Sequence, residues 1–283
     1  MPRVIFHGVR GSFPCGGPDY LKYGGNTSCV EIRTNDPEPI ILDLGTGLVR
    51  LADRLESREN FRASVLLSHP HWDHIQGLPY FKPLHVTGSQ IEIFAPPVEI
   101  SCGEPYQVHL GDVFDKAFSP PLFPVSWNQL GGKVAIHELN SSSFSIGGAN
   151  VTCAPVPHPG INLGFKIMVS GVSIGYVSDH QMPRDDREID PEVLKLIEGV
   201  DLLIHDAQYS QAEFEAKSDW GHSTYAYAVH VAHEAQVKCL VPFHHDPSHS
   251  DKAMDQISAH LVQMAKQVGI ECRVAMEGME INL

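Results

Sequence analysis

The chain has 283 residues, 42% of them hydrophobic, and its formal net charge is −14 at pH 7. This length and hydrophobic content suffice for a substantial core, and we expect one folded domain over residues 1–283. The excess of acidic side chains opposes long-range attraction of a polyanion, so large nucleic acids are disfavoured as substrates.

The cysteines and the N-terminus indicate the compartment. No CxxC pair occurs, and the six cysteines are scattered through apolar runs, which is typical of buried thiols in a reducing environment. The chain enters a strand pattern at once, and no long apolar segment occurs in it, so we expect a cytoplasmic protein with neither signal peptide nor membrane span. The cysteines are Cys15, Cys29, Cys102, Cys153, Cys239 and Cys272.

In chain order, most of the regular structure is expected to be strand. A first strand is expected at residues 4–9, and a loop rich in Gly and Pro follows at 10–25. Prolines break any long element within 96–135, where the aromatic residues are expected to pack rather than to stack on a substrate. Those aromatics are Phe114, Phe118, Phe123 and Trp127. Further strands are expected at 28–33 and 39–42 (a hairpin), 64–67, 91–95, 149–154, 164–169, 172–177, 201–207, 238–243, 271–276 and 279–283, and helices at 48–56, 183–197, 252–268 and after Thr224.

The most informative stretch is SHPHWDH at 68–74, a loop expected between a buried strand and a short helix. In extended backbone, His69 and His71 point the same way and can share one cation, while Asp73 and His74 project toward a neighbouring position. Imidazole and carboxylate ligands suit zinc, manganese or iron, and two such ions close together hydrolyse phosphoesters or amides. A histidine-rich surface loop is the alternative, but the complete HxHxDH spacing is far more specific than a lone HxH.

These residues carry a resemblance to a known family. His69, His71, Asp73 and His74 match the HxHxDH signature of the metallo-β-lactamase fold superfamily. With Ser68 before it and Gly77 after it, the form SHxHxDHxxG resembles the ribonuclease Z and phosphodiesterase branch, and the resemblance extends over nearly the whole chain. It implies a four-layered αββα sandwich with two metal ions at one edge of the sheets.

The resemblance also implies a role for polar residues that follow strands elsewhere in the chain. His158 would join His69 and His71 around one ion, and His244 would join Asp73 and His74 around the other. Asp179 would bridge both ions. An adjacent pair cannot aim at one ion, so His245 is the reserve for His244. Asp43, in the segment DLGTG, would be a buried residue that braces the histidine loop, or else a simple turn aspartate.

A second pair is expected to be catalytic without binding metal. The segment DLLIHDA at 201–207 resembles the DLLIHEA segment of ribonuclease Z, with Asp206 in place of glutamate. His222, in GHST, matches the element of that branch in which the histidine is catalytic. Asp206 would hold the imidazole in position as a general acid or charge stabiliser. Alternatively, Ser223 or Thr224 only caps the next helix.

The expected chemistry is attack of a metal-bridging hydroxide on a phosphodiester, with Asp73, Asp206 and His222 as the catalytic residues. We expect two divalent metal ions. The all-histidine first site favours zinc, with manganese as the alternative, over a di-iron redox centre. The rival functions are an aryl or alkyl sulfatase, an RNA-processing nuclease like ribonuclease Z, and a metal-binding protein without hydrolytic activity. A homodimer is left open.

The expected substrate is a small phosphodiester, with cyclic nucleotides first. Ribonuclease Z carries a long basic arm before the bridging aspartate, whereas only 20 residues separate His158 from Asp179 here, and a hairpin fills them. Basic residues are also sparse around the expected ligands, and a folded RNA needs an extended basic surface. Those expected near the opening of the site are Arg10, Lys22, Lys82 and Lys166.

Overall fold

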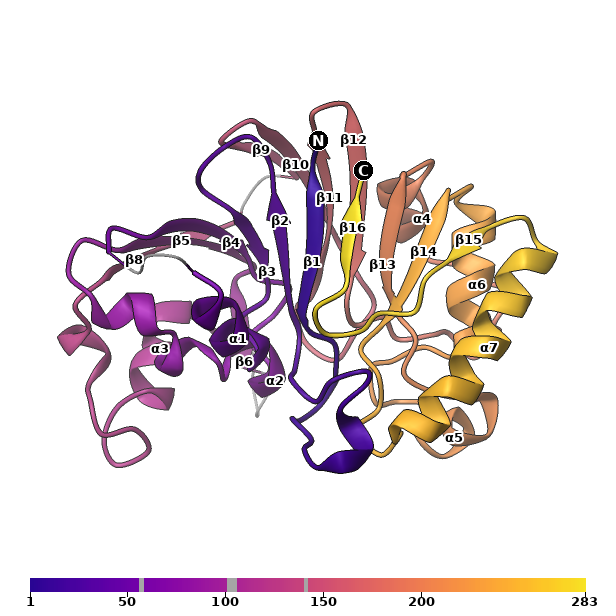
Figure 1. The fold of residues 1–283 in the computed structure, drawn as a ribbon, viewed down its shortest axis with the longest axis horizontal. Coiled ribbons are helices and arrows are strands. Elements are labelled where there is room, and N and C mark those ends of the chain that lie inside the picture. The colour runs from indigo at the N-terminus through magenta and orange to yellow at the C-terminus, as the bar shows by residue number, and fades with distance from the viewer. Residues whose placement is uncertain (56–58, 101–105, 140–141) are drawn as a thin grey trace.

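A computed structural model describes residues 1–55, 59–100, 106–139 and 142–283. Two seven-stranded sheets lie face to face at the centre of the molecule, and helices cover their outer faces (Figure 1). The first sheet has the order β16-β1-β2-β3-β4-β5-β8, the second has the order β15-β14-β13-β12-β11-β10-β9, and β6 pairs with β7.

The strands are β1 (Arg3–Gly8), β2 (Cys29–Arg33), β3 (Ile40–Leu42), β4 (Arg62–Leu66), β5 (Gln90–Ala95), β6 (Val98–Ile100), β7 (Tyr106–Val108), β8 (Lys133–Glu138), β9 (Ser143–Ile146), β10 (Ala149–Pro155), β11 (Leu163–Val169), β12 (Val172–Val177), β13 (Leu202–Asp206), β14 (Cys239–Phe243), β15 (Glu271–Cys272) and β16 (Glu280–Asn282). The α-helices are α1 (Gly47–Asp53), α2 (Trp72–Ile75), α3 (Leu110–Ala117), α4 (Pro191–Ile197), α5 (Gln211–Ala216), α6 (Tyr225–Glu234) and α7 (Asp251–Gln267). Short 3-10 turns occur at Pro18–Tyr20, Leu78–Tyr80, Lys82–His85 and Trp127–Gln129.

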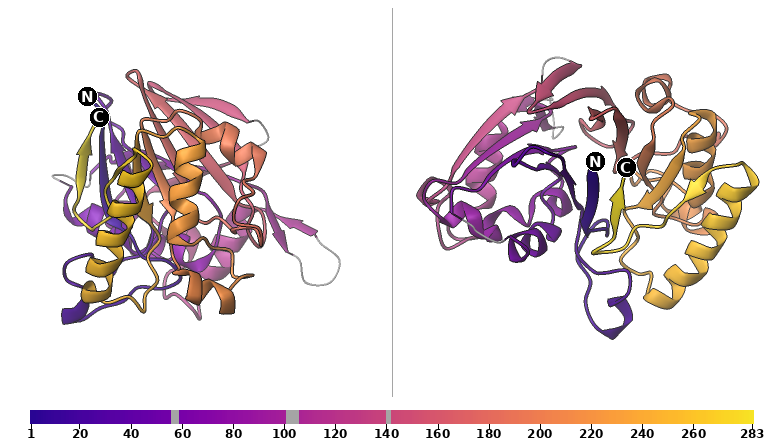
Figure 2. Two further views of the ribbon diagram at one scale, coloured as in Figure 1. Left: turned by 90° about the vertical axis from the view of Figure 1, so that its right-hand side faces the viewer. Right: turned by 45° about the horizontal axis from the view of Figure 1, so that its top comes forward.

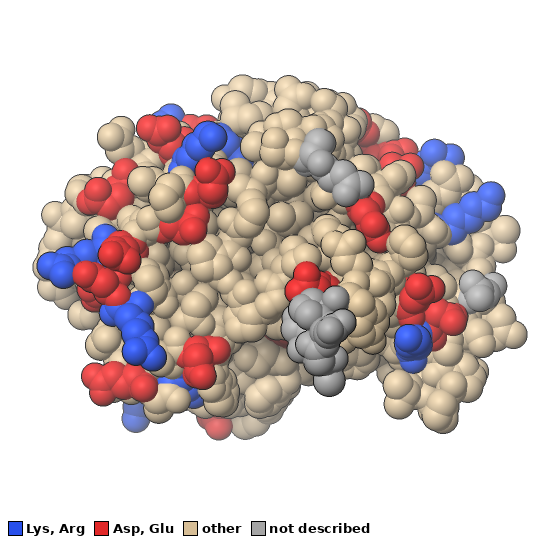
Figure 3. Space-filling model, turned by 180° about the vertical axis from the view of Figure 1, so that it is seen from behind, with Lys and Arg blue, Asp and Glu red and all other residues tan. Residues whose placement is uncertain are grey.

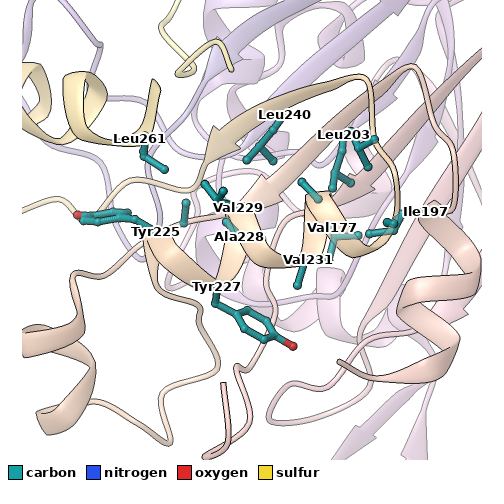
Figure 4. Close-up of a cluster of buried hydrophobic side chains, with 14 of the residues drawn as sticks. Val177, Ile197, Leu203, Tyr225, Tyr227, Ala228, Val229, Val231, Leu240 and Leu261 are labelled. Carbon is teal, nitrogen blue, oxygen red and sulfur yellow. The ribbon is translucent and has the colours of Figure 1, made fainter. Parts of the chain in front are cut away.

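Three apolar clusters separate the layers. In β13, Leu202 and Ile204 join the cluster between the two sheets, while Leu203 points the other way, into the cluster under the helices. This alternation follows from the two-residue period of a strand, which lets each central strand serve two cores. Figure 4 shows the outer cluster, in which Ala228 and Val231 of α6 pack near Leu203 and Leu240. A third cluster lies between the first sheet and α1 to α3.

The four layers are therefore helices, sheet, sheet and helices, which confirms the αββα architecture expected from the sequence (Figure 2). Both sheets are partly parallel: β3, β4, β5 and β8 run together in one, and β12 to β15 run together in the other. The loops at the carboxyl ends of parallel strands meet at one edge of a sheet. That edge is the lower one in Figure 1, beside α2 and α5.

Two element boundaries differ clearly from the sequence expectations, and one stretch without expected elements contains some. The helix expected at 183–197 begins only at Pro191, because the Asp190 carboxylate caps its first turn by accepting bonds from the amides of Glu192 and Val193. The strand expected at 271–276 is only Glu271–Cys272, since the chain then leaves the second sheet to add β16 to the first. Residues 96–135 contain α3 and three short strands or parts of strands.

Two sequence expectations concern residues outside the described ranges: the thiol of Cys102, and residue 56 as the last residue of the first helix. Within the described residues, α1 ends at Asp53. No helix in the described ranges combines the length and apolar character needed to cross a bilayer.

Candidate metal centre

Histidines and aspartates from both halves of the chain meet at the edge where the parallel strands end. The loop after β4 and the short helix α2 supply His69, His71, Asp73 and His74. The second sheet supplies its side chains from the ends of four strands. They are His158 after β10, Asp179 after β12, Asp206 at the end of β13 and His244 after β14.

The first group, here called the histidine triad, consists of His69, His71 and His158. Their potential ligand atoms lie within 4.8 Å of one another, and their ring centroids are 4.4 to 4.8 Å apart. The imidazoles of His69 and His158 are buried, whereas His71 is exposed. This triad therefore faces solvent on one side.

The second group, here called the mixed triad, consists of Asp73, His74 and His244. The Nε2 atoms of His74 and His244 lie 3.3 and 3.2 Å from Asp73 Oδ2 and 3.3 Å from each other. All three residues are buried. Three ligand atoms thus converge on one point inside the protein.

Asp179 lies between the two triads and presents one oxygen to each. Its Oδ2 is 3.6 Å from His158 Nε2 and 3.8 Å from His69 Nε2. Its Oδ1 is 3.1 Å from His74 Nε2 and 3.4 Å from His244 Nε2. A carboxylate in this position can bridge two cations.

Hydrogen bonds to the far side of each ring hold the mixed triad in place. His74 Nδ1 donates to Asp43 Oδ2 at 2.7 Å, and His244 Nδ1 donates to Gln208 Oε1 at 2.9 Å. The amide of Ser12 donates to Asp73 Oδ2 at 2.8 Å. Such bonds fix the tautomer and the orientation of a ligand.

Asp43 is a buried brace for the histidine loop, and it stands in the left-handed backbone region with φ 59°. Besides His74, it accepts bonds from the Ser68 amide at 2.7 Å and from the Tyr176 hydroxyl at 2.6 Å. Ser68 Oγ in turn lies 3.0 Å from His69 Nδ1. By contrast, His158 Nδ1 is buried without a hydrogen-bond partner among the described residues.

Two glycines let the backbone approach the ligands closely. A Cβ at Gly11 would lie 2.4 Å from two ring atoms of His244, and one at Gly221 would lie 2.6 Å from His158 Cδ2. Gly221 also has φ 93°, which side chains rarely adopt. A larger residue at either glycine would therefore displace one ligand, His244 or His158.

The charges at the centre fit divalent cations. Burial lowers the pKa of His158 to about 4 and that of His69 well below its usual value, so both rings are neutral as ligands must be. Burial opposes protonation of His74, but the carboxylates of Asp179, Asp73 and Asp43 raise its pKa well above the usual value. His69 Nε2 is buried without a hydrogen-bond partner among the described residues, and a cation in the histidine triad would satisfy it.

Asp206 and His222 form a second arrangement beside the triads. Asp206 Oδ2 lies 3.1 Å from His222 Nδ1 and accepts bonds from the amides of His180 and Ser223. Since Nδ1 is engaged there, Nε2 is the atom left to meet a substrate. His222 Nδ1 lies 3.7 Å from Asp179 Oδ2. Thr224 also caps α6, through a bond from the Tyr227 amide to its Oγ1, so the helix cap and the Asp206–His222 pair coexist.

The structure brings together all nine site residues expected from the sequence, and it separates the two candidate histidines. His244 enters the mixed triad, whereas His245 Nε2 lies 2.9 Å from the carbonyl oxygen of Ala275. Gln208 and Ser12, which hold His244 and Asp73, carried no sequence signal because they lie in loops without a pattern. The S-x-x-E spacing of Ser210 and Glu213 did signal the cap of α5, which the sequence expectations omitted.

The four basic residues expected near the opening of the site are all engaged in other contacts. Lys22 pairs with Asp255, Lys82 pairs with Asp53, and Lys166 donates to the carbonyl oxygen of Glu198. The Arg10 guanidinium is buried and donates to backbone carbonyl oxygens of Gly24, Asp246 and His249, so it ties loops together. Lys217 lies over the ring of Tyr209, which contacts His222, and pairs with Asp246 at 3.0 Å.

Comparisons with known proteins match this architecture. Residues 40–245 match the profile of a family described as "Beta-lactamase superfamily domain". Ribonuclease Z of Natronomonas pharaonis is 25% identical, with 86% of each chain covered. Ribonuclease Z of Brevibacillus brevis is 37% identical over 83 residues, a match that spans 26% of that protein's length. Among solved structures, a diphosphatase from the PhnP family has a TM-score of 0.71 at 16% identity, covering 100% of this chain and 98% of that one.

Proposed function

We propose that this chain, which belongs to the beta-lactamase superfamily domain family and is a hydrolase of the metallo-β-lactamase fold, cleaves small phosphodiesters, with cyclic nucleotides first among them. The proposal takes residues 1–283 as one catalytic domain. The observation that carries it is the position of Asp179, whose two oxygens face two separate groups of three ligands. Sites that hold two cations close together clamp the attacking and leaving oxygens of a displacement at phosphorus.

The ligand set supports two divalent ions, with zinc first and manganese as the alternative. His69, His71 and His158 would hold one, Asp73, His74 and His244 would hold the other, and Asp179 would touch both. When bound, the ions supply activation of a water molecule and neutralisation of charge on the phosphoryl oxygens. The chain's own part includes the orientation of His74, His244 and His69, through Asp43, Gln208 and Ser68 respectively.

His222 is the proposed proton donor or charge stabiliser. Its Nδ1 is fixed by Asp206, which is fully buried and held by backbone amides on either side. A ring fixed in this way presents Nε2 in one direction, and a general acid must meet its leaving-group oxygen within hydrogen-bond reach. Asp206 is a positioning residue in this scheme.

Three observations favour a small substrate. The segment between His158 and Asp179 is occupied by the hairpin of β11 and β12, so no arm extends from it. Basic and acidic side chains are interspersed on the face shown in Figure 3, where the described residues form no extended basic surface. The formal charge of −14 further opposes a polyanion.

An RNA substrate is the second candidate, and the similarity to ribonuclease Z proteins favours it. The two candidates make opposite predictions about salt. A single phosphate contact gives a weak salt dependence, whereas an RNA bound through many phosphates gives a steep one.

The test compares kcat/KM for a cyclic nucleotide, bis-p-nitrophenyl phosphate, p-nitrophenyl sulfate and a precursor transfer RNA at physiological salt. Protein stripped with a chelator and protein reloaded with zinc or manganese serve as controls. We expect metal-dependent turnover of the diesters above the sulfate ester and the RNA. Efficient, salt-sensitive RNA cleavage without diester turnover would replace the proposal by the second candidate, and turnover of sulfate alone would contradict both.

A further inference from the structure

A cavity of about 470 Å³ lies directly beside the mixed triad. Its walls come from three loops that are far apart in sequence, at 12–20, 208–220 and 246–248. We call it the aromatic pocket and define it by six of its lining residues: Phe13, Tyr20, Tyr209, Lys217, Trp220 and Asp246.

The pocket shares its inner wall with the metal centre. Ser12 lines the pocket, and its amide holds Asp73, while Gln208 lines it and holds His244. The ring of Tyr209 lies edge-on to His222, with 5.7 Å between ring centroids. One substrate molecule could therefore place its phosphate at the metal centre and an attached group in the pocket.

Aromatic rings at the rim of the pocket are exposed without an evident structural role. Phe13 is 58% exposed and Trp220 is 59% exposed, although large aromatic side chains are usually buried. Phe114 and Phe118, in contrast, are buried in the cluster beneath α3, as the sequence indicated. Lys217 lies over the rings of Tyr209 and Trp220, at 4.5 and 5.5 Å from their centroids, and so helps to hold Trp220 at the rim.

The pocket carries no net formal charge. Lys217 and Asp246 are the charged groups among its described lining residues, and they pair with each other at 3.0 Å. A pocket of this kind suits an uncharged planar group with polar edges and does not suit a second phosphate.

We propose that the aromatic pocket binds the nucleobase of the substrate, stacked against Trp220 and Phe13, while the adjoining phosphodiester lies at the metal centre. The assignment rests on the proposed function and narrows it to phosphodiesters that carry a nucleoside. Base stacking on aromatic side chains tolerates any base, because every base has a π-face. The enzyme should therefore prefer nucleotides to alkyl diesters and discriminate weakly among bases.

The experiment measures a preference ratio, which is kcat/KM for a cyclic nucleotide divided by kcat/KM for cyclic glycerol phosphate. The second substrate has no aromatic base to stack. Trp220→Ala and Phe13→Ala are the pocket variants. Tyr106→Ala, in β7, is the matched control, since Tyr106 is also an exposed aromatic residue, at 53%, and does not line the pocket. Circular dichroism checks that each variant folds.

We expect the wild-type ratio to exceed ten and each pocket variant to lower it by about tenfold, mainly through KM, because stacking of one base has about that worth. The control should keep the wild-type ratio. A wild-type ratio near one, or an unchanged ratio in both pocket variants, would overturn the nucleobase assignment while leaving diester hydrolysis intact.

If no diester is cleaved, the proposed function fails, but ligand binding still tests the pocket. Adenosine monophosphate and glycerol phosphate are titrated into zinc-loaded protein by calorimetry. The nucleotide should bind about tenfold more tightly in the wild type and in Tyr106→Ala, and this advantage should be lost in Trp220→Ala. Equal affinities in the wild type would contradict the pocket assignment directly.

Discussion

The histidine triad and the mixed triad are built from similar ligands but are held very differently. Every member of the mixed triad is buried and bonded to a specific brace, namely Asp43, Gln208 or the Ser12 amide. In the histidine triad, His71 is exposed, and His158 Nδ1 is buried without a partner among the described residues. Since braces of this kind tune metal affinity, ligand type alone would mislead about the relative strength of the two sites.

We infer a division of labour from this difference. The mixed triad would retain its cation, while the solvent-facing histidine triad would exchange its cation more readily. The Asp206–His222 pair adjoins both through Asp179.

The largest effect is expected from a pair of glycine substitutions. Gly11→Ala would push His244 out of the mixed triad, and Gly221→Ala would push His158 out of the histidine triad. Gly221→Ala should keep one tightly bound ion per chain through chelator dialysis, and Gly11→Ala should keep none. Activity should fall on the order of a thousandfold in both, since neither variant has a complete two-cation site.

Elemental analysis after dialysis measures this outcome, with circular dichroism as the folding control. If Gly11→Ala kept one ion and Gly221→Ala kept none, the histidine triad would be the tighter metal site, which contradicts the account.

His222→Ala should affect chemistry without affecting either triad. Removal of a general acid lowers kcat by on the order of a hundredfold or more, and metal content should stay at the wild-type value. Asp206→Asn, which weakens the orientation of the ring, should give a smaller loss of kcat at similar KM. Loss of a metal ion in His222→Ala would mean that the residue is a ligand, and full activity would reduce GHST to a helix cap.

Asp43→Asn tests the brace of the mixed triad. Asparagine tolerates the left-handed backbone at this position, but its amide group cannot accept bonds at both oxygen positions. Metal affinity of the mixed triad should fall about tenfold to a hundredfold, as for other residues that orient a ligand. Competition with a chromophoric chelator gives the two affinities, and an equal loss at both triads would show that Asp43 acts mainly through Ser68.

Tyr176→Phe should have the smallest effect. The buried hydroxyl donates to Asp43 at 2.6 Å, and loss of a hydrogen bond to a charged group costs about 2 kcal/mol of unfolding free energy. Asp43 keeps its bonds from His74 and Ser68, so metal affinity should change only a few-fold. Urea unfolding of the metal-free protein measures the stability, and an unchanged midpoint would remove Tyr176 from the brace.

The sequence predicted the ligands better than the braces. The loop at 68–74 was readable because four ligands lie within six positions, whereas His158, Asp179 and His244 are single residues that only the family resemblance singled out. The braces are distant in sequence: 31 residues separate Asp43 from His74, 36 separate Gln208 from His244, and 61 separate Ser12 from Asp73. No local pattern reports contacts of that kind.

For the fold too, local patterns were predictable and contacts between distant residues were not. Most strands of the two sheets were predicted within a few residues, because their period is local, but β8 and β9 were not predicted. The partners of the basic residues were not predicted, since a lysine's ion-pair partner is set by tertiary contacts, as with Lys217 and Asp246. The aromatic pocket was missed for the same reason, because its loops at 12–20, 208–220 and 246–248 come from distant parts of the chain.

Anomalous diffraction from crystals of the zinc-loaded protein tests the central claim most directly. With one equivalent of zinc, a single peak should lie among Asp73, His74, His244 and Asp179. With excess zinc, a second peak should appear among His69, His71 and His158, and Asp179 should contact both. A single peak in excess zinc, first occupancy of the histidine triad, or an Asp179 that contacts neither ion would contradict the account.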